Sequence, residues 1–220
     1  MKAEVIIVAA GAGTRFGSKV PKALVPLKGL PLIAHSLKIF EQNRGIDGII
    51  VVANSRYLGR FQALTKRFKR VRAVVAGGKT RAESVKCGLA ALKADTDAVL
   101  VHDAARPLVD AVMVKRLIEA LRSNKAVIAA VPVKPTIKEV DPRTQTVVKT
   151  LRRDKLWEVQ TPQGFHKDIL VKAHSRTFKG EATDDAVLVE AMGVKVKAVM
   201  GSYRNIKITT PEDLLVAKAL

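Results

Sequence analysis

Short apolar runs alternate with longer amphipathic segments along most of this chain, and this alternation constrains the fold more than any other feature. The apolar runs are rich in Val, Ile and Ala and are bounded by turn residues: Val5–Ala10, Asp47–Ala53, Arg72–Ala76, Ala98–His102 and Ala126–Val131. Such runs are typical of strands covered on both faces. The segments between them have helical spacing: Leu32–Gln42, Leu58–Phe68, Ala82–Lys93 and Val112–Ser123. The alternation predicts an α/β fold with a doubly wound, mostly parallel sheet and a site at the carboxyl ends of its strands.

Capping signals support two of the helix boundaries. Thr80 and Glu83 have the spacing of a capping box at the third helical segment. Thr210, Pro211 and Asp213 announce a C-terminal helix. The length of 220 residues is typical of one domain, so we expect a single domain over residues 1–220.

Residues 133–157 break the alternation. Ile137–Val140 and Thr146–Leu151 are short β-like stretches around the turn signal Asp141-Pro142-Arg143. They predict a hairpin arm outside the main sheet, and an arm without a core of its own is expected to pack on a second subunit. The chain then returns to α/β character, with a predicted strand at Val194–Met200.

The charge of the chain indicates an anionic ligand. Lys and Arg number 39 against 20 Asp and Glu, which gives a formal net charge of +19. This balance attracts nucleic acid, an acidic membrane surface or phosphorylated small molecules. Aromatic residues make up only 4%, so little is available for a stacking platform that binds single-stranded nucleic acid. The basic residues are also spread over the whole chain.

Cysteine usage and hydropathy bear on the compartment. Cys87 is the one cysteine, which excludes an intrachain disulfide and fits a reducing cytoplasm. No apolar run approaches the ~18–20 residues that a membrane span needs. Val5–Ala10 is too short, and too close to charged residues, for a signal peptide. We therefore expect a soluble, cytoplasmic protein.

A glycine turn follows the first predicted strand: Ala9-Ala10-Gly11-Ala12-Gly13-Thr14-Arg15-Phe16-Gly17. Its glycines let backbone N–H groups approach phosphate oxygens. It is not a P-loop, because no Gly-Lys-Ser/Thr follows, and it is a poor dinucleotide fingerprint, because Phe16 stands where a third small residue belongs. Arg15 and Lys22 place two cations beside the turn, which suits a triphosphate.

A second motif, His102-Asp103-Ala104-Ala105-Arg106-Pro107, ends the fourth predicted strand. Asp103 could meet Mg²⁺ or a hydroxyl group there, and Arg106 could bind a phosphate through two hydrogen bonds. An Asp103 that caps the next turn, paired with Arg106, is an equally good interpretation of the spacing. His102 fits a packed, hydrogen-bonded histidine better than a general base.

Two further segments could contact a nucleotide or sugar. Gly77-Gly78-Lys79-Thr80-Arg81, with Ser84, combines a double glycine with a helix N-terminus, although a plain capped turn explains it equally well. Lys207, in Asn205-Ile206-Lys207, is either a cation at a strand end or a solvated lysine. Arg152, Arg153, Trp157 and Thr161-Pro162-Gln163 form a polar group near the arm.

No hydrolase nucleophile elbow, metalloprotease motif or cysteine pair for zinc is present, and the histidines lack ligand spacing.

Taken together, these motifs resemble one family, 2-C-methyl-D-erythritol 4-phosphate cytidylyltransferase of the non-mevalonate isoprenoid pathway. The matching pieces are Ala-Ala-Gly-x-Gly-x-Arg, Pro21-Lys22, Gly-Gly-x-x-Arg-x-x-Ser, His-Asp-Ala-Ala-Arg-Pro, Thr-Pro-Gln and Asn-Ile-Lys, in unbroken order over nearly the whole chain. The resemblance implies a Rossmann-like nucleotidyltransferase fold and a homodimer joined by the β-arm. It also implies CTP as substrate, Mg²⁺ held mainly by the CTP phosphates with no strong protein ligand, and release of pyrophosphate.

The resemblance also implies roles for individual residues. Four would stabilise charge or orient the attacking phosphate: Arg15, Lys22, Arg153 and Lys207. Nine would contact the nucleotide: Ala9, Ala10, Gly11, Ala12, Gly13, Gly77, Gly78, Ser84 and Ala104. Four would hold the methylerythritol phosphate: Asp103, Arg106, Thr136 and Thr161. Thr136 and Arg153 would reach across from the partner's arm.

The sequence departs from the family pattern at four positions. Ala23 follows Lys22 where Gln is usual, Phe16 replaces a usual Met, and Lys79 and Pro135 stand where Asp is common. None of these changes removes a charge that the reaction requires. We expect them to alter affinity and positioning rather than the reaction.

Three alternatives remain at this point. Ribitol 5-phosphate cytidylyltransferase shares the fold, loop and chemistry, but Ala104-Ala105 and Ala9-Ala10 resemble the isoprenoid enzyme more closely. A nucleic-acid-binding protein predicts a localised basic face and base-stacking aromatics, and the sequence has neither. A paralogue that binds nucleotide without turnover is disfavoured by the retained basic residues.

Overall fold

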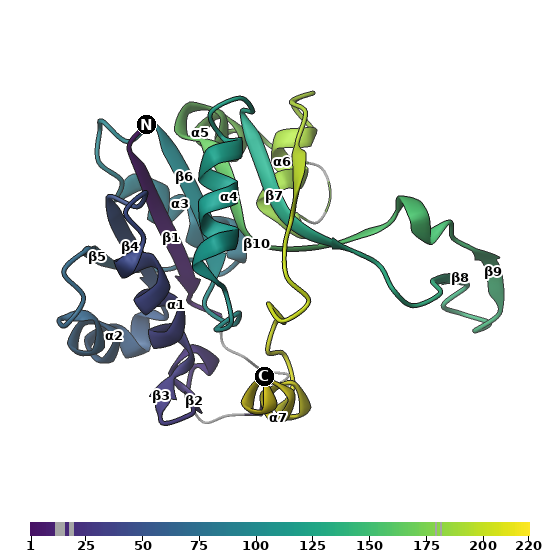
Figure 1. Ribbon diagram of the computed structural model, residues 1–220, viewed down its shortest axis with the longest axis horizontal. Coiled ribbons are helices and arrows are strands. Elements are labelled where there is room, and N and C mark those ends of the chain that lie inside the picture. Colours follow the sequence, from purple (N-terminus) through teal and green to yellow (C-terminus); the bar gives the residue numbers. More distant parts are fainter. Residues whose placement is uncertain (12–15, 18–19, 179, 181) are drawn as a thin grey trace.

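The computed structural model describes residues 1–11, 16–17, 20–178, 180 and 182–220. Its centre is a seven-stranded sheet in the order β11-β7-β10-β6-β1-β4-β5 (Figure 1). The strands are β1 (Ala3–Ala9), β4 (Gly48–Ala53), β5 (Val71–Ala76), β6 (Ala98–Asp103), β7 (Ala126–Pro132), β10 (Trp157–His166) and β11 (Lys197–Met200). β10 is antiparallel to both β6 and β7, and the other neighbours in the sheet are parallel. The expected α/β, mostly parallel sheet is confirmed.

The middle of this sheet is its best-covered part. β4 and β6 are buried at every position, as their continuous apolar sequences predict. β5 differs from the prediction, because it lies at the sheet edge and its residues are only half-buried or exposed. An edge strand has a neighbour on one side only, so coverage on both faces is harder to complete.

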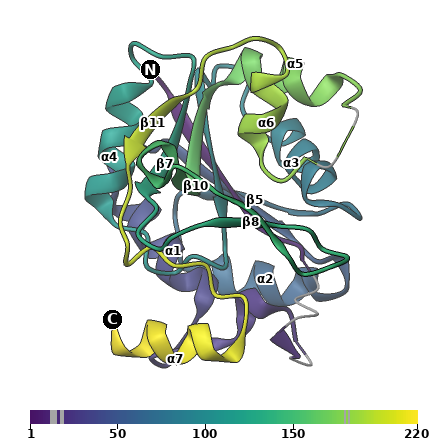
Figure 2. The same cartoon turned by 90° about the vertical axis from the view of Figure 1, so that its right-hand side faces the viewer.

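Helices cover the two faces of the sheet (Figure 2). One apolar cluster packs Val5 and Ile7 of β1 against α1 (Leu32–Gln42), α2 (Leu58–Thr65) and α4 (Ala111–Ala120). The other packs Ile6 against α3 (Arg81–Ala90), α5 (Lys167–Ser175) and α6 (Asp185–Glu190). The split follows from strand geometry, since consecutive side chains point to opposite faces. Among the described residues, no helix is long and apolar enough to cross a lipid bilayer.

A third, smaller apolar cluster packs the C-terminal helix against residues from the N-terminal half of the chain. The helix α7 (Pro211–Ala219) packs through Ala217 in the same cluster as Leu27 of β2 (Pro26–Leu27), which pairs with β3 (Leu30–Pro31) in a two-stranded ribbon. Ile208, which precedes α7, lies in the same cluster and is fully buried. The chain between β11 and α7 is thereby held close to the main sheet.

The predicted helices and caps agree closely with the structure. α1 has the predicted bounds, and Thr80 with Glu83, like Thr210 with Asp213, forms a complete capping box. α2 ends at Thr65, three residues before the predicted end. Short 3₁₀ helices occur at Lys22–Leu24, Ser55–Tyr57 and Arg153–Lys155.

The strand β10 and the helices α5 and α6 were not predicted individually. β10 contains Pro162 within a cis Thr161–Pro162 peptide, and its pairing with β7 shifts register between Val159 and Gln163. Proline and an irregular register both obscure the strand pattern in a sequence. α6 has only six residues, too few to show a helical period.

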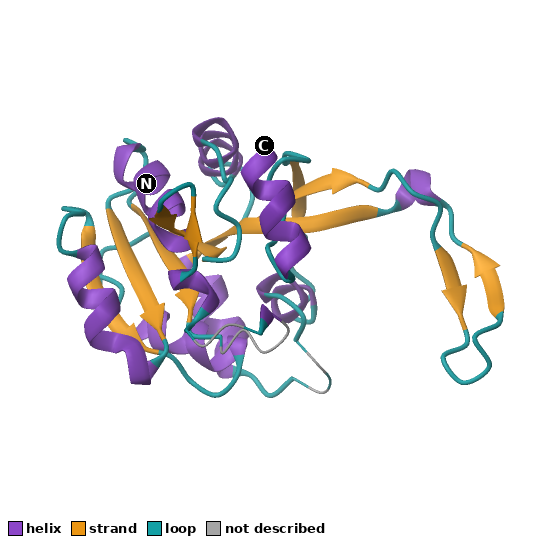
Figure 3. Ribbon diagram, turned by 90° about the horizontal axis from the view of Figure 1, so that it is seen from below, coloured by secondary structure: helices purple, strands orange, loops and turns teal. Residues whose placement is uncertain are grey.

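The hairpin arm predicted from residues 133–157 is confirmed as a hairpin. β8 (Lys138–Val140) and β9 (Val147–Thr150) pair antiparallel and are exposed at every residue. At the turn between them, the carboxylate of Asp141 accepts a hydrogen bond from the Arg143 N–H at 2.8 Å. The hairpin projects away from the main sheet (Figure 3).

Candidate active site

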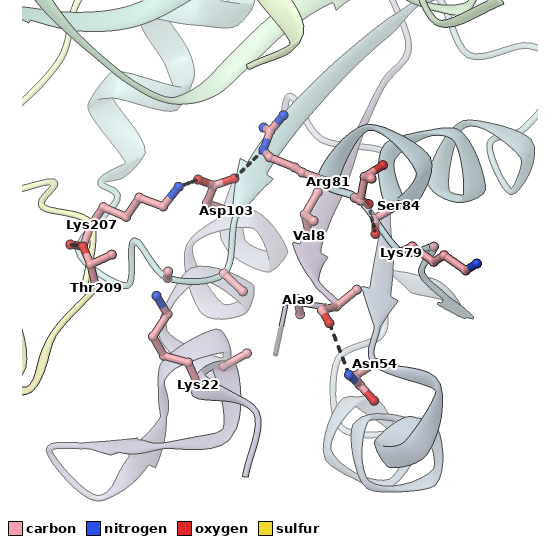
Figure 4. Close-up of a pocket in the computed structure, with 17 residues that line it drawn as sticks. Val8, Ala9, Lys22, Asn54, Lys79, Arg81, Ser84, Asp103, Lys207 and Thr209 are labelled. Carbon is pink, nitrogen blue, oxygen red and sulfur yellow. Dashed lines mark hydrogen bonds and ion pairs between the residues drawn. The ribbon is translucent and has the colours of Figure 1, made fainter. Parts of the chain in front are cut away.

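A pocket of about 540 Å³ opens where the carboxyl ends of β1, β4, β5 and β6 meet (Figure 4). Seventeen residues line it: Val8, Ala9, Ala10, Gly11, Lys22, Ala23, Asn54, Gly78, Lys79, Thr80, Arg81, Ser84, Asp103, Ala104, Ala105, Lys207 and Thr209. This is the edge at which open α/β sheets bind ligands. The pocket therefore lies where the alternation of strands and helices predicts a site.

The lining of this pocket is strongly cationic. Lys22, Lys79, Arg81 and Lys207 contribute four positive charges, and Asp103 is the one carboxylate among the lining residues. Figure 4 shows that Lys22 and Lys207 reach the cavity from different segments of the chain. Such a concentration of cations with a single counter-charge favours anionic ligands.

Asp103, the last residue of β6, is held by two cations. Its carboxylate lies 2.7 Å from the Lys207 ammonium and 3.2 Å from Nε of Arg81. Burial alone would raise the pKa of Asp103, but the charges of Arg81 and Lys207 outweigh it and hold the pKa below its ordinary value. Asp103 is therefore a fixed anion that can accept hydrogen bonds from hydroxyl groups of a ligand.

The backbone of Asp103 is fixed as well. Its N–H donates to Oγ of Thr161 at 3.0 Å, and the Thr161 hydroxyl lies 3.1 Å from Nδ1 of His102. His102 is fully buried, and this burial lowers its pKa to about 4, so its ring is neutral at pH 7. The interpretation of His102 as a packed, hydrogen-bonded histidine agrees with this arrangement.

The double glycine permits a close approach at the N-terminus of α3. A Cβ on Gly77 would stand 2.4 Å from Cβ of Ala10 and 2.7 Å from Oγ of Ser84, far inside contact distance. Ser84 in turn donates to the Thr80 carbonyl at 2.9 Å. Only glycine lets α3 and the turn after β1 share this wall of the pocket.

Asn54, directly after β4, is a site residue that the sequence analysis missed. Its side-chain amide donates to the carbonyl of Ala10 at 3.3 Å, and its carbonyl oxygen accepts from the Arg56 N–H at 3.1 Å. It thus ties the turn after β1 to the next strand. A polar residue at the end of a buried parallel strand was the available signal.

Arg81 also lines the pocket, and the sequence analysis named it within a motif without giving it a role of its own. Besides Asp103, its guanidinium binds the carboxylate of Asp185 at 2.7 Å. Burial alone would lower the pKa of Arg81, but Asp185 and Asp103 raise it above the ordinary value. Arg81 appears in the Gly-Gly-x-x-Arg-x-x-Ser motif, which was the signal that could have found it.

Arg106 lies beside the pocket rather than in its lining. Its buried guanidinium donates to the carbonyls of Asn205 at 2.7 Å and Val159 at 3.2 Å. The N–H of Ile208 donates to the carbonyl of Ala105 at 2.8 Å. The His-Asp-Ala-Ala-Arg-Pro motif thereby fixes the segment that brings Lys207 to Asp103.

The structure brings together many of the predicted site residues. Those that line the pocket are Ala9, Ala10, Gly11, Lys22, Gly78, Ser84, Asp103, Ala104 and Lys207. Gly77, Thr161 and Arg106 contact this group without lining the cavity. Ala12, Gly13 and Arg15 lie outside the described residues.

Thr136 and Arg153 are not brought to this pocket within one chain. Both lie in the exposed arm, where Arg153 donates to the carbonyl of Lys134 at 2.7 Å. The arm extends away from the sheet that bears the pocket (Figure 1).

Comparisons with known proteins identify a family. A model of the family 2-C-methyl-D-erythritol 4-phosphate cytidylyltransferase matches residues 3–220. A curated protein of that name from Alkaliphilus oremlandii is 44% identical over 227 residues, covering 100% of this chain and 94% of its own length. Another, from Dehalococcoides mccartyi, is 46% identical over 221 residues, covering 100% of this chain and 96% of its own length.

Solved structures lead to the same family. The crystal structure of 4-diphosphocytidyl-2C-methyl-D-erythritol synthase from Anaerococcus prevotii superposes with a TM-score of 0.86 at 34% identity, covering 99% of this chain and 97% of that one. The 2-C-methyl-D-erythritol 4-phosphate cytidylyltransferase from Thermus thermophilus superposes with a TM-score of 0.80 at 33% identity, covering 100% and 98%. Because sequence, fold and full-length coverage agree, the chain belongs to the 2-C-methyl-D-erythritol 4-phosphate cytidylyltransferase family of nucleotidyltransferases.

Proposed function

We propose that the pocket joins CTP to 2-C-methyl-D-erythritol 4-phosphate, giving 4-diphosphocytidyl-2-C-methyl-D-erythritol and pyrophosphate. The observation that supports this best is the Asp103 carboxylate held between two cations in a pocket whose other charged lining residues are all cations. Two phosphorylated substrates need such cations, and a polyol needs a fixed acceptor for its hydroxyl groups. The family to which the chain belongs has this reaction in its name.

The chemistry needs no activated side-chain nucleophile. An oxygen of the acceptor's phosphate, largely deprotonated at neutral pH, attacks the α-phosphorus of CTP in line. The bond from that phosphorus to the bridging oxygen breaks, and pyrophosphate leaves with the electron pair. The protein's task is to bring two anions together and stabilise the added charge, for which positioned cations are suited.

The proposed nucleotide site lies on the side of the pocket that β1 and α3 form. Gly77 and Gly78, with Ser84 and Ala104, contact the cytidine, and Ala9–Gly13 hold the triphosphate. Arg15 and Lys22 stabilise charge on the phosphates in the transition state. The helix N-terminus at α3 adds N–H groups that favour an anion.

Residues on the opposite side form the proposed acceptor site. Asp103, Arg106 and Thr161 hold the methylerythritol phosphate, and Lys207 orients its attacking phosphate. The ion pair that Lys207 makes with Asp103 supports placing both at one end of the pocket. Thr136 and Arg153 complete this site from the arm of a second subunit.

Magnesium fits this site as a companion of the nucleotide. Within the described residues no group of three or more His, Cys, Asp and Glu side chains could hold a metal ion, and Asp103 is already paired with two cations. Mg²⁺ commonly binds through substrate phosphates with few protein ligands. Held by the CTP phosphates, it would neutralise charge on them. Lys22 and Lys207 would then position the two phosphorylated groups beside it.

The same proposal includes a homodimer that works in the cytoplasm. Residues 1–220 form one nucleotidyltransferase domain, with residues 133–157 as its dimerisation arm. The arm exposes Val140, Val147 and Val148, which favours a protein partner over solvent. A single cysteine, Cys87, fits a reducing compartment.

Pyrophosphate release in the presence of CTP and Mg²⁺ tests the function. We expect turnover with 2-C-methyl-D-erythritol 4-phosphate and little with ribitol 5-phosphate. Omitting the acceptor controls for CTP hydrolysis. Pyrophosphate release with ribitol 5-phosphate alone would contradict the assigned acceptor. No pyrophosphate release with either acceptor, in a protein that binds CTP, would favour a non-catalytic nucleotide-binding paralogue.

A further inference from the structure

A chain of polar contacts leads from the pocket, through Arg81 at the start of α3, to the first residue of α6. Arg81 binds Asp103 with its Nε at 3.2 Å and Asp185 with its Nη1 at 2.7 Å. Asp185 begins α6, a helix on which the function proposed above places no residue. One arginine thus joins the carboxylate in the pocket to a carboxylate behind it (Figure 4 shows the pocket end of this chain).

Asp185 is itself held on several sides. Its other oxygen lies 2.9 Å from Nε2 of His174 in α5, and both side chains are nearly fully buried. Its N–H donates to Oε1 of Gln163 in β10 at 3.3 Å, and the Gln163 amide donates to Asp184 at 2.7 Å. A carboxylate fixed this firmly is a rigid anchor for the guanidinium of Arg81.

Gln163 belongs to the Thr161-Pro162-Gln163 motif, and the two polar residues of this motif reach Asp103 by separate routes. Thr161 accepts a hydrogen bond from the Asp103 backbone N–H. Gln163 reaches the Asp103 side chain through Asp185 and Arg81. The short strand segment therefore holds the Asp103 backbone directly and supports the Asp103 carboxylate indirectly, through the backbone of Asp185 and the side chain of Arg81.

The charges explain why an anchor is needed. Without Asp185, Asp103 would be the one carboxylate partner of Arg81 among the described residues, and the guanidinium could turn so that two of its N–H groups donate to Asp103. Asp103 would then have fewer lone pairs left for ligand hydroxyl groups. Because Asp185 engages Nη1, Arg81 makes a single longer contact with Oδ1 of Asp103 and Lys207 takes Oδ2.

We propose that Asp185 is a positioning residue for cytidylyl transfer: anchored by His174 and Gln163, it orients Arg81 and, through Arg81, the Asp103 carboxylate that receives the acceptor. This inference rests on the proposed role of Asp103 at the acceptor. It identifies α6 as part of the support of the active site. It also predicts a defect confined to one of the two substrates.

The test is steady-state kinetics of the full-length Asp185→Asn variant, which keeps the shape of the side chain and removes its charge. We expect kcat/KM for the acceptor to fall about ten- to hundredfold, the size of a lost charged hydrogen bond, while KM for CTP stays within about twofold. Glu190→Gln, which removes an exposed charge from the other end of α6, is the matched control and should behave as wild type. Equal losses for both substrates, or no loss, would overturn the proposal.

A double-mutant cycle with Arg81→Gln separates positioning from general support of the fold. If Asp185 acts through Arg81, Asp185→Asn should cost little more than about twofold in the Arg81→Gln background. Fully additive losses would overturn the proposal. If Arg81→Gln does not fold, as thermal melting and CTP binding would show, the substrate-selective loss in Asp185→Asn decides alone.

Asp103→Asn, measured beside these variants, separates this inference from the assignment on which it rests. A loss of acceptor kcat/KM in Asp103→Asn without one in Asp185→Asn overturns the positioning role alone. No loss in Asp103→Asn overturns the assignment of Asp103 and the inference with it. Selective losses in both variants support both.

Discussion

The ammonium group of Lys207 lies 2.7 Å from the carboxylate of Asp103, joining a residue near the C-terminus to the end of a central strand. The two meet because Arg106 and Ala105 bind the backbone of the segment 205–208. Together with Arg81, Lys207 keeps Asp103 ionised despite its burial. The ion pair thereby defines the end of the pocket proposed for the acceptor.

Lys207→Ala should impair use of the acceptor. We expect kcat/KM for the acceptor to fall roughly tenfold or more, because a charge-assisted contact to its phosphate is lost. The pKa of Asp103 should also rise when one of its two cations is removed, because less positive charge then stabilises its carboxylate.

The measurement is kcat/KM for the acceptor at neutral pH, with KM for CTP followed in parallel. Lys218→Ala, at an exposed position of α7, is the matched control and should leave both unchanged. A wild-type kcat/KM for the acceptor in Lys207→Ala would contradict the assignment of Lys207 to the acceptor site.

Lys22→Ala should slow the chemical step itself. The side chain lines the pocket beside the turn after β1, where the triphosphate is proposed to lie. Losing a cation that stabilises charge in the transition state should lower kcat by about 10²-fold or more. Single-turnover rates with saturating CTP measure this, and Lys38→Ala on the exposed side of α1 serves as control. Unchanged turnover in Lys22→Ala would end its catalytic assignment.

Gly77→Ala should damage nucleotide binding with little change in the acceptor site. The added Cβ would stand 2.4 Å from Cβ of Ala10, so α3 and the turn after β1 must move apart. We expect KM for CTP to rise roughly tenfold or more, since a displacement of about 1 Å in a positioned site is costly. Gly59→Ala in α2 is the control, because its added Cβ meets nothing within 4 Å. Wild-type CTP affinity in Gly77→Ala would show that the close approach is dispensable.

Most of the fold could be predicted because most of its strands are short, mainly apolar segments that alternate with helices. The continuous apolar runs that became β4 and β6 are buried throughout, and a buried strand flanked by helices leaves a clear signature. β10 left no such signature. Its Pro162 and its shifted register interrupt the pattern, although it is the strand that joins the two parallel halves of the sheet.

The candidate site was predictable where a motif lies at the end of a strand, as with Asp103 at the end of β6. Contacts made over long distances in the chain were not. Arg81 and Asp185 are 104 residues apart, and nothing local to either predicts that they meet. Their pairing depends on α3 and α6 packing on the same face of the sheet.

From the position of the arm we predict that active sites are shared between subunits. Arg153 lies in the exposed hairpin, away from the pocket of its own chain, whereas Lys22 lines that pocket. Arg153→Ala and Lys22→Ala homodimers should each be impaired. Mixing equal amounts under conditions of subunit exchange should make about half of the dimers hybrids, and each hybrid keeps one intact site of two. The mixture should therefore recover up to about a quarter of the wild-type activity.

The measurement is activity after co-refolding equal amounts of the two variants, with hybrid formation verified by differently tagged chains. A mixture of Arg153→Ala with a second preparation of the same variant is the control. Hybrids that form but show no recovery would contradict a shared site.

His102 predicts a specific loss of stability in mild acid. Its pKa is lowered by burial to about 4, whereas an unfolded histidine titrates near 6.5. Above pH 6.5 the ring is neutral in both states and contributes no pH dependence. Between about pH 6.5 and 4 the unfolded chain binds a proton that the folded protein does not, so stability falls as the pH falls.

The expected loss approaches about 3 kcal/mol over this window, at roughly 1.4 kcal/mol per pH unit. Urea unfolding of wild type and His102→Gln at several values from pH 7 to 4.5 measures it, because every other titrating group is common to both chains. The free energy of unfolding of wild type should fall more steeply with decreasing pH than that of His102→Gln, even though the variant is less stable at pH 7. Parallel curves would mean that His102 is protonated in the folded protein, and the assignment of a neutral, buried ring would have to be abandoned.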